Sequence, residues 1–244
     1  MARKWILPTL LVLFGAVICV RLGIWQLDRL SQRRAFNQHY VDMASDSPLR
    51  LPDSENLDQM EYRAVVARGT FDFSNQIAIR NQYYRDQYGY HILTPFVMED
   101  GSAVLVDRGW IPAQGNSDRN GWEKYNEDAL TTVRGVVRLS RDKGDIIGNS
   151  DPELSPGQTR LDIWNFPNIP RIQEQLPYSL LPIYIQESNP ALNDPAPIRV
   201  PPDVEITEGP HLGYALQWFT FAAILLVGYP FYVRKHSQRE DIGK

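Results

Sequence analysis

The sequence predicts a membrane protein of the α+β class. Two transmembrane helices, one near each end of the chain and packed as a hairpin, flank one extracytoplasmic β-rich domain with a short helix. Two long apolar segments lie near the ends, and the residues between them form short runs in which apolar and polar side chains alternate. The chain has a single cysteine, Cys19, so the middle domain has to be stabilised by its core and not by disulfide bonds.

The first apolar segment, Ile6 to Leu27, contains one charged residue, Arg21. Its about 22 residues, at about 1.5 Å of rise each, would cross a hydrocarbon layer of about 30 Å. A cleaved signal peptide is the alternative, because Arg3 and Lys4 precede the segment. The segment is long for a signal sequence and no Ala-x-Ala site follows it, so we expect a retained helix.

The second apolar segment, Leu212 to Val233, has no charged residue and carries aromatic residues towards both ends. Acidic residues precede it and basic residues, beginning with Arg234 and Lys235, follow it. Cytoplasmic flanks are enriched in basic residues, which places both termini in the cytoplasm and the middle domain outside it. Four arginines at the exit of the first helix depart from this pattern and need an explanation: Arg21, Arg29, Arg33 and Arg34.

Small residues recur at helical spacing in both apolar segments. Gly15, Cys19 and Gly23 form a stripe on the first, and Ala215 and Ala222 form a weaker one on the second. We therefore expect the two helices to pack together as a hairpin. Small residues placed by chance in an apolar helix are the open alternative.

The middle of the chain predicts strands, with a hairpin turn at Glu99–Ser102 and one helix at 169–176. The segment 141–159 is expected to be a loop, and the proline-rich segment after Glu187 an extended tether. The expected strands are 62–71, 76–80, 90–97, 103–107, 133–139 and 182–186. The expected parts are a cytoplasmic N-terminus (1–5), a first transmembrane helix (6–27), a juxtamembrane helix and linker (28–60), a β-rich domain (61–186), a tether (187–211), a second transmembrane helix (212–233) and a cytoplasmic tail (234–244).

Composition and motifs exclude several functions. A net charge of -4 and a pI near 5.6 make nucleic acid an unexpected partner. The sequence contains no HExxH, phosphate-binding loop, GxGxxG or GxSxG motif, so we expect no enzyme. His91 lies in a predicted strand, where a half-buried, hydrogen-bonded histidine is expected.

His211 is the histidine that invites a functional interpretation, because it opens the second apolar helix at the outer interface. Tyr214 and Trp218 follow it on one side of that helix, and Trp25 and Arg29 leave the first helix in the same leaflet. Imidazole, aromatic planes and guanidinium groups are what a haem needs for its iron, its macrocycle and its propionates. An aromatic belt with arginines on lipid phosphates is the alternative, and on the residues alone it is the simpler one.

Several ordered blocks also carry a family resemblance that covers almost the whole chain. They are Leu22–Arg29 (LGIWQLDR), Arg68–Asp72 (RGTFD), Gly89–Phe96 (GYHILTPF), Val104–Pro112 (VLVDRGWIP), Leu181–Tyr184 (LPIY) and His211–Phe219 (HLGYALQWF). In these blocks the chain resembles the Surf1 family, the cytochrome c oxidase assembly factors.

The resemblance implies an assembly factor, or chaperone, for haem–copper cytochrome c oxidase, which assists haem a insertion into subunit I or stabilises it there. It implies oxidase subunit I and haem A synthase as partners beside the lipid bilayer. Haem a would be held transiently, with His211 as iron ligand and with Tyr214, Trp218, Trp25 and Arg29 around it. Many family members have Arg and Asn just before this histidine, where this chain has Gly209 and Pro210. Arg21 or Arg29 would then have to bind the propionates.

Three alternatives accompany this interpretation. One is a membrane-anchored scaffold that binds no haem, and another is a two-helix sensor or transport accessory whose outer domain binds a small ligand. The third is an enzyme that uses residues of the outer domain outside any recognised motif. No transit peptide precedes the first helix, so we expect a multi-pass protein of the bacterial plasma membrane.

Overall fold

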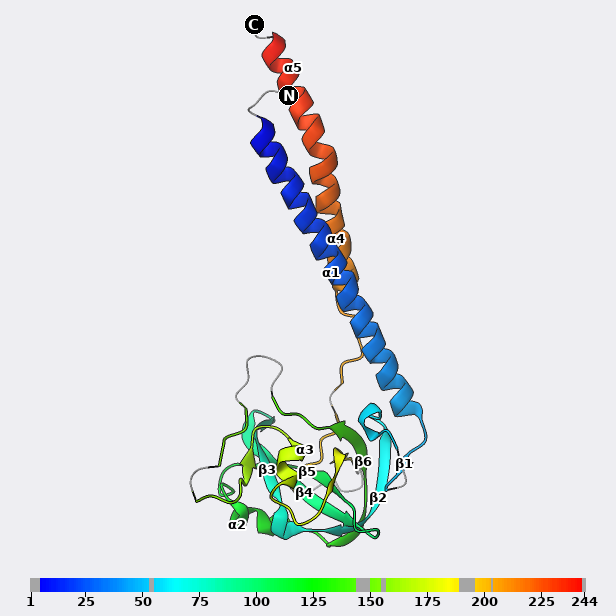
Figure 1. Cartoon of the computed structure of the whole chain (residues 1–244), viewed down its shortest axis with the longest axis vertical. Helices are drawn as coiled ribbons and strands as arrows, with labels where there is room; N and C mark the ends of the chain where they lie inside the picture. The colour runs from blue at the N-terminus through cyan, green and yellow to red at the C-terminus, as the bar shows by residue number, and fades with distance from the viewer. Residues whose placement is uncertain are drawn as a thin grey trace. The chain divides into compact units, whose positions relative to one another are not determined.

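The computed structural model describes residues 5–52, 55–143, 150–154, 157–188, 196–202 and 204–242. The chain divides into two compact units, one made of residues 1–39 and 205–244 and the other of residues 40–204. Two helices long and apolar enough to cross a membrane flank a β-rich domain, as the sequence predicts (Figure 1).

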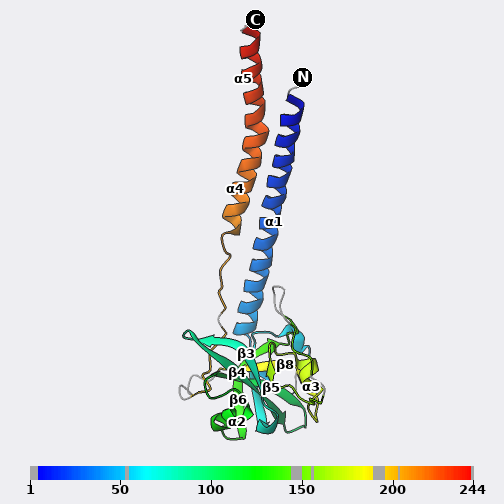
Figure 2. The same cartoon turned by 90° about the vertical axis from the view of Figure 1, so that its left-hand side faces the viewer.

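The first unit is a helical hairpin. Helix α1 (Ile6–Ser45) continues well past the apolar segment, and the returning helix consists of α4 (His211–Ala223), the turn η5 (Ile224–Gly228) and α5 (Tyr229–Ile242). The two helices run side by side in opposite directions (Figures 1 and 2). Most of their large apolar side chains are exposed, which suits helices that face lipid.

The predicted small-residue stripe lies between these helices. Cys19 and Gly23 of α1 are buried, and so are Ala215 and Ala222 of α4. Small side chains allow two backbones to approach closely where no hydrophobic effect drives association. Near the start of α1, a hydrogen bond of 2.8 Å joins the hydroxyl group of Thr9 to that of Tyr229 on the returning helix.

The returning helix is longer than the predicted segment, which ends at Val233 and would therefore have Pro230 in its last turn. A proline in that position costs little, because its missing N–H group removes few hydrogen bonds there. In the structure the helix continues to Ile242, and the π-helical turn η5 directly precedes Tyr229 and Pro230. A π-helical turn changes the hydrogen-bond register locally, which lets a helix continue through a break in its ladder.

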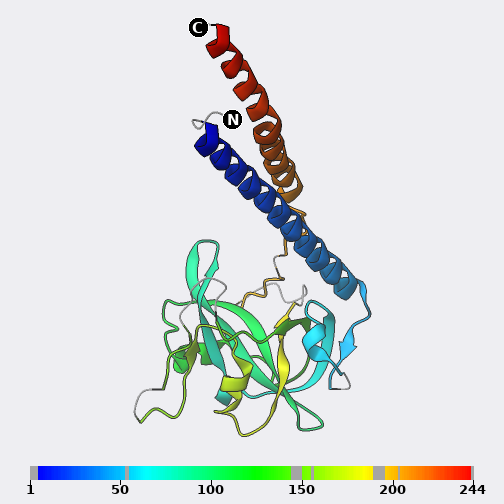
Figure 3. The same ribbon diagram turned by 45° about the horizontal axis from the view of Figure 1, so that its top comes forward.

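The second unit is a closed β-barrel with additional short elements (Figure 3). The strand order is β1-β2-β6-β8-β5-β4-β3-β7, and a further pairing of β2 with β4 closes β2, β6, β8, β5 and β4 into the barrel. The strands are β1 (Leu49–Arg50), β2 (Ala64–Phe71), β3 (Ile77–Tyr84), β4 (Gln87–Met98), β5 (Ala103–Pro112), β6 (Leu130–Leu139), β7 (Ile163–Trp164) and β8 (Leu180–Glu187). The short helices are η2 (Leu57–Gln59), η3 (Phe73–Asn75), α2 (Arg119–Trp122), η4 (Glu123–Tyr125) and α3 (Ile169–Gln173).

The core follows from the alternation of side chains along each strand. Phe71, Phe96, Val106 and Ile185 belong to the main cluster of buried apolar residues, to which strands all round the barrel contribute. A second cluster contains Leu93 of β4, Leu105 of β5 and two residues of β3, and it is completed by α3 and by Trp164 of β7. Because it packs on both faces, β5 begins with a continuous apolar run, Ala103–Val106, and not with an alternating one.

The predicted strands form, and several extend beyond the predicted ends. The helix expected at 169–176 is shorter and ends at Gln173. Part of the loop expected at 141–159 lies outside the described residues. Residues 196–202 of the expected tether pack on the β-domain, since the backbone of Ile198 pairs with that of Trp110 and Arg199 forms ion pairs with Glu127 and Glu187.

Candidate functional site

His211 is anchored by a residue of the first helix that the sequence did not single out. Its Nδ1 atom lies 2.8 Å from Oε1 of Gln26. An amide oxygen only accepts hydrogen bonds, so Nδ1 donates, and in the neutral imidazole the other ring nitrogen, Nε2, then keeps its lone pair. Gln26 lies one helical turn after buried Gly23, on the face of α1 that packs against α4, and this spacing is the signal that could have identified it.

The aromatic residues that follow His211 lie beside the contact between α1 and α4 and not within it. Ala215, four residues on, is buried against α1, whereas the side chain of Tyr214 is about half exposed. Trp218 is partly buried and packs edge-to-face against Phe221, with ring centroids 5.9 Å apart. His211, Tyr214 and Trp218 thus share the side of α4 next to the helix contact, as their spacing predicts.

Trp25 and Arg29 form a pair on α1. The guanidinium carbon of Arg29 lies 5.5 Å from the ring centroid of Trp25, and its Nη1 donates to Oε1 of Gln32. Within the described part of the chain, neither Trp25 nor Arg29 makes a hydrogen bond, ion pair or ring contact with α4. The structure therefore brings His211 to Gln26 and keeps the Trp25–Arg29 pair separate, so the haem-site role of these residues stays a prediction.

Two of the four unexplained arginines bind the chain just before α4. Arg33 donates to the backbone carbonyl oxygens of Glu205 and Thr207 at 2.5 and 2.9 Å. Arg34 forms a bidentate pair with the carboxylate of Glu208, both distances being 2.8 Å. Arg33 and Arg34 thus have partners in the segment that leads to His211, which explains why two arginines occur at this end of the hairpin.

A haem iron would find one ligand here. Among the described residues, no group of three or more His, Cys, Asp or Glu side chains could hold a bare metal ion. The ring nitrogens of a haem complete most of the coordination of its iron, so a single imidazole is a sufficient protein ligand. His211 fits this role because Gln26 fixes the ring and leaves Nε2 as a ligand atom.

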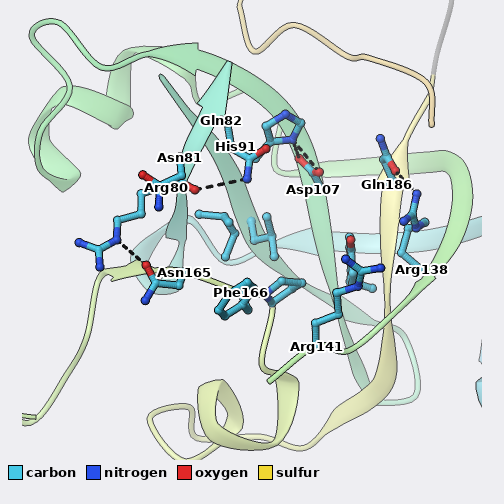
Figure 4. A pocket seen from close by; sticks show the side chains of 14 residues that line it. Arg80, Asn81, Gln82, His91, Asp107, Arg138, Arg141, Asn165, Phe166 and Gln186 are labelled. Atoms are coloured by element: carbon cyan, nitrogen blue, oxygen red, sulfur yellow. Dashed lines mark hydrogen bonds and ion pairs between the residues drawn. The ribbon is translucent and has the colours of Figure 1, made fainter. Parts of the chain in front are cut away.

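The β-domain contains a second candidate site, a cleft of about 510 Å³ on the outer face of the barrel (Figure 4). At its wall, Nδ1 of His91 on β4 lies 2.8 Å from Oδ2 of Asp107 on β5. A β-bulge in β5 sets this contact, because two residues, Arg108 and Gly109, stand opposite one residue of β4. Gly109 has φ +122°, and a Cβ atom there would lie 2.5 Å from the carbonyl oxygen of Ile198. The half-buried, hydrogen-bonded histidine expected at position 91 is confirmed.

Arginines dominate the charge of the cleft. Arg138 on β6 donates to Oε1 of Gln186 at 3.2 Å and lies 3.3 Å from the carboxylate of Glu61. Arg141 follows β6, and its backbone N–H donates to the carbonyl oxygen of Pro167. Figure 4 shows Arg138 and Arg141 on one side of the cleft and Arg80 on the opposite side. This site is not predicted from the sequence, because its residues are far apart along the chain.

The cleft also changes the acidity of two groups. Burial lowers the pKa of His91, but the charge and hydrogen bond of Asp107 outweigh burial, so this pKa is raised above the usual value. Burial raises the pKa of Tyr184 to about 12, although the positive charges of Arg138 and Arg141 act in the opposite direction. Both arginines therefore lie close enough to influence the Tyr184 hydroxyl.

Comparison with known proteins gives one family. The model of the SURF1 family matches residues 13–223. The SURF1-like protein of Rickettsia conorii is 28% identical, over 93% of this chain and 91% of its own. The SURF1-like protein of Rickettsia bellii is 26% identical, over 94% and 92% of the two chains, and that of Caenorhabditis elegans is 22% identical, over 92% and 73%. The ordered blocks, the helical hairpin and these matches lead to one conclusion: the chain belongs to the SURF1 family.

Proposed function

We propose that this chain is a non-enzymatic assembly factor for haem–copper cytochrome c oxidase. It assists the insertion of haem a into subunit I, or stabilises the haem there, by transient contact with that subunit. Haem A synthase is the second proposed partner. Membership of the SURF1 family supports this function.

The contact between His211 and Gln26 carries the haem part of the proposal. A histidine that ligates a metal usually donates its other ring N–H group to an acceptor, which fixes the tautomer and the ring orientation. Gln26 supplies such an acceptor, so Nε2 of His211 would hold the iron of haem a. Trp25, Tyr214 and Trp218 would contribute apolar surface for the macrocycle, and Arg29 or Arg21 a cation for the propionates. The iron and the porphyrin supply the redox chemistry, whereas these residues bind and orient the haem.

The proposal includes a membrane location. Both apolar helices would span the bacterial plasma membrane, with the two termini in the cytoplasm and the β-domain outside it. Helix length and the basic residues Arg234 and Lys235 support this orientation. A membrane-impermeant maleimide tests it on a Cys19→Ser background. We expect the reagent to label Leu130→Cys in intact spheroplasts and to label Ser237→Cys only after lysis, and the reverse pattern would refute this orientation.

Haem binding is tested on protein purified from membranes of cells that make haem A. We expect the native protein to show a haem absorption spectrum and His211→Ala to lose it while its fold is kept. His236→Ala is the matched control, because His236 lies near the other end of the same helix and its Nδ1 donates to the carbonyl oxygen of Tyr232. Equal haem content in all three proteins would remove His211 as the ligand.

The assembly role needs its own measurement. Deletion of the gene should lower cytochrome c oxidase activity, and the native gene should restore it. If the native protein contains no haem but deletion of the gene lowers oxidase activity, the chain would be an assembly scaffold that binds no haem. Full oxidase activity after deletion would reject the assembly function itself.

A further inference from the structure

The cleft of the β-domain has the charge of an anion-binding site. The described residues that line it include three arginines, Arg80, Arg138 and Arg141, and one acidic residue, Asp107. This carboxylate is already bound, because Nδ1 of His91 and the backbone N–H of Gly109 both lie within 3.0 Å of its oxygens. Glu61, outside the lining, offsets part of the charge of Arg138. Positive charge therefore remains in excess inside a concave surface, where fields are focused.

Two of the guanidinium groups are arranged to act together. Arg138 is held by Gln186 and Glu61, and its guanidinium carbon lies 5.0 Å from the ring centroid of Tyr62. Arg138 and Arg141 both line the cleft, and Figure 4 shows them on the same side of it. Planar guanidinium groups held in this way bind carboxylate and phosphate oxygens with defined geometry.

The remaining surface of the cleft suits the body of a small molecule. Leu93 and Phe166 supply apolar surface, and Asn81 and Gln82 supply amide groups. Nε2 of His91 makes no hydrogen bond with any described residue, and so it can serve a ligand. A volume of about 510 Å³ lies within the range of about 300 to 1,000 Å³ that is usual for small-molecule sites.

We propose that this cleft binds a small organic anion, with its carboxylate or phosphate group at Arg138 and Arg141 and its body against Leu93 and Phe166. The site is separate from His211 and does not depend on haem binding. It gives the β-domain a ligand of its own. His91, oriented by Asp107, contributes a further polar contact from the opposite wall.

Thermal unfolding of the full-length protein in a non-ionic detergent tests the site. The probes are inorganic phosphate, glycerol 3-phosphate and succinate, each compared with sodium chloride at equal ionic strength. A ligand that binds the folded state alone raises the unfolding temperature with a saturable concentration dependence. We expect such a rise with at least one probe and none with chloride. Tighter binding of glycerol 3-phosphate indicates a phosphate ester such as a lipid headgroup, whereas tighter binding of succinate indicates a free carboxylate.

Arginine variants locate the binding. Arg141→Gln should weaken the apparent affinity about 10-fold or more, the loss of one charge-assisted contact. Arg134→Gln is the matched control, because Arg134 lies on β6, the strand that precedes Arg141, is exposed and is not part of the lining. Arg138→Gln is interpreted only if its circular dichroism spectrum matches the native one, since Arg138 also contacts Glu61. No saturable rise with any probe, or unchanged affinity in Arg141→Gln, overturns the proposal.

Discussion

The ring of Phe219 covers the Cα atom of Gly23 so closely that a Cβ atom at position 23 would lie 2.7 Å from Cε1 of the ring. Gly15, two turns earlier on the same helix, leaves 3.5 Å between such an atom and Cδ1 of Leu225, an ordinary contact. An alanine at position 23 would therefore have to displace the ring of Phe219, whereas an alanine at position 15 would make an ordinary contact.

Gly23→Ala and Gly15→Ala should accordingly have different effects on the stability of the hairpin. Both gain about 1 kcal/mol of helix propensity, but only Gly23→Ala adds an overpacking cost of about 1–3 kcal/mol. We expect Gly23→Ala to unfold at a lower temperature than Gly15→Ala in the same detergent. Equal unfolding temperatures would show that Phe219 can move away from α1 without cost.

The His91–Asp107 pair should make the stability of the β-domain depend on pH. Since the pKa of His91 is raised in the folded state, its contribution is complete below the usual histidine pKa and is lost as pH rises through the raised value. The free energy of unfolding lost in His91→Gln should therefore be larger at pH 5.5 than at pH 8.5. His39→Gln, on α1, is the control, and a His91→Gln loss that is independent of pH would contradict the assignment.

The ion pair of Glu187 and Arg199 should be important for stability. Both side chains are nearly inaccessible, with exposed fractions of 6% and 5%. Arg199→Leu would leave a buried carboxylate without its main partner, at a cost of about 3–5 kcal/mol in the free energy of unfolding. The exposed Arg68–Glu99 pair gives the control, because Arg68→Leu should cost less than about 1 kcal/mol.

The pKa of Glu187 provides a second test of the ion pair between Glu187 and Arg199. Burial raises the pKa of Glu187 despite the opposing effect of Arg199. In Arg199→Leu this carboxyl group should take up a proton more readily, so denaturant unfolding should show a smaller loss at pH 5 than at pH 8. An equal loss at both values would mean that Glu187 finds another partner.

Gln26 should affect haem binding if His211 is the ligand. Gln26→Leu removes the acceptor of the Nδ1 proton and is expected to weaken haem binding about 10- to 100-fold, the usual effect of losing such a partner. Gln217→Leu removes a glutamine from the exposed surface of α4 and serves as the control. Haem titration of the purified apoprotein measures both, and equal affinities would separate Gln26 from haem binding.

The sequence predicts elements whose signal is local. Apolar length identifies both helices, and alternation identifies the main strands, because each pattern is complete within one segment. The two-residue strand β7 (Ile163–Trp164) carries too short a pattern, so it was not predicted. The packing of Arg199 was not predicted for another reason. Its partner Glu187 belongs to a strand, and the only pattern in the segment between the two residues is its proline content, which does not indicate a contact.

The candidate sites show the same limit. His211 was identified because position and residue type coincide at a helix end, but Gln26 becomes relevant only once the helices are paired. Arg138 and Arg141 read as ordinary charged residues at the end of a strand. Arg138 and Arg141 line the same cleft as His91 because the barrel brings β4 and β6 to it.

Strand β8 lies between β6 and β5, although it is made after both of them. A ribosome that has produced the chain as far as Leu139 has supplied both neighbours of a gap, but not the strand that fills it. Until Leu180–Glu187 emerges, the facing backbone edges of β5 and β6 have no partner in the barrel, and such edges invite pairing with other chains. The interval between the synthesis of β6 and that of β8 is therefore the period in which these open strand edges expose the protein to aggregation.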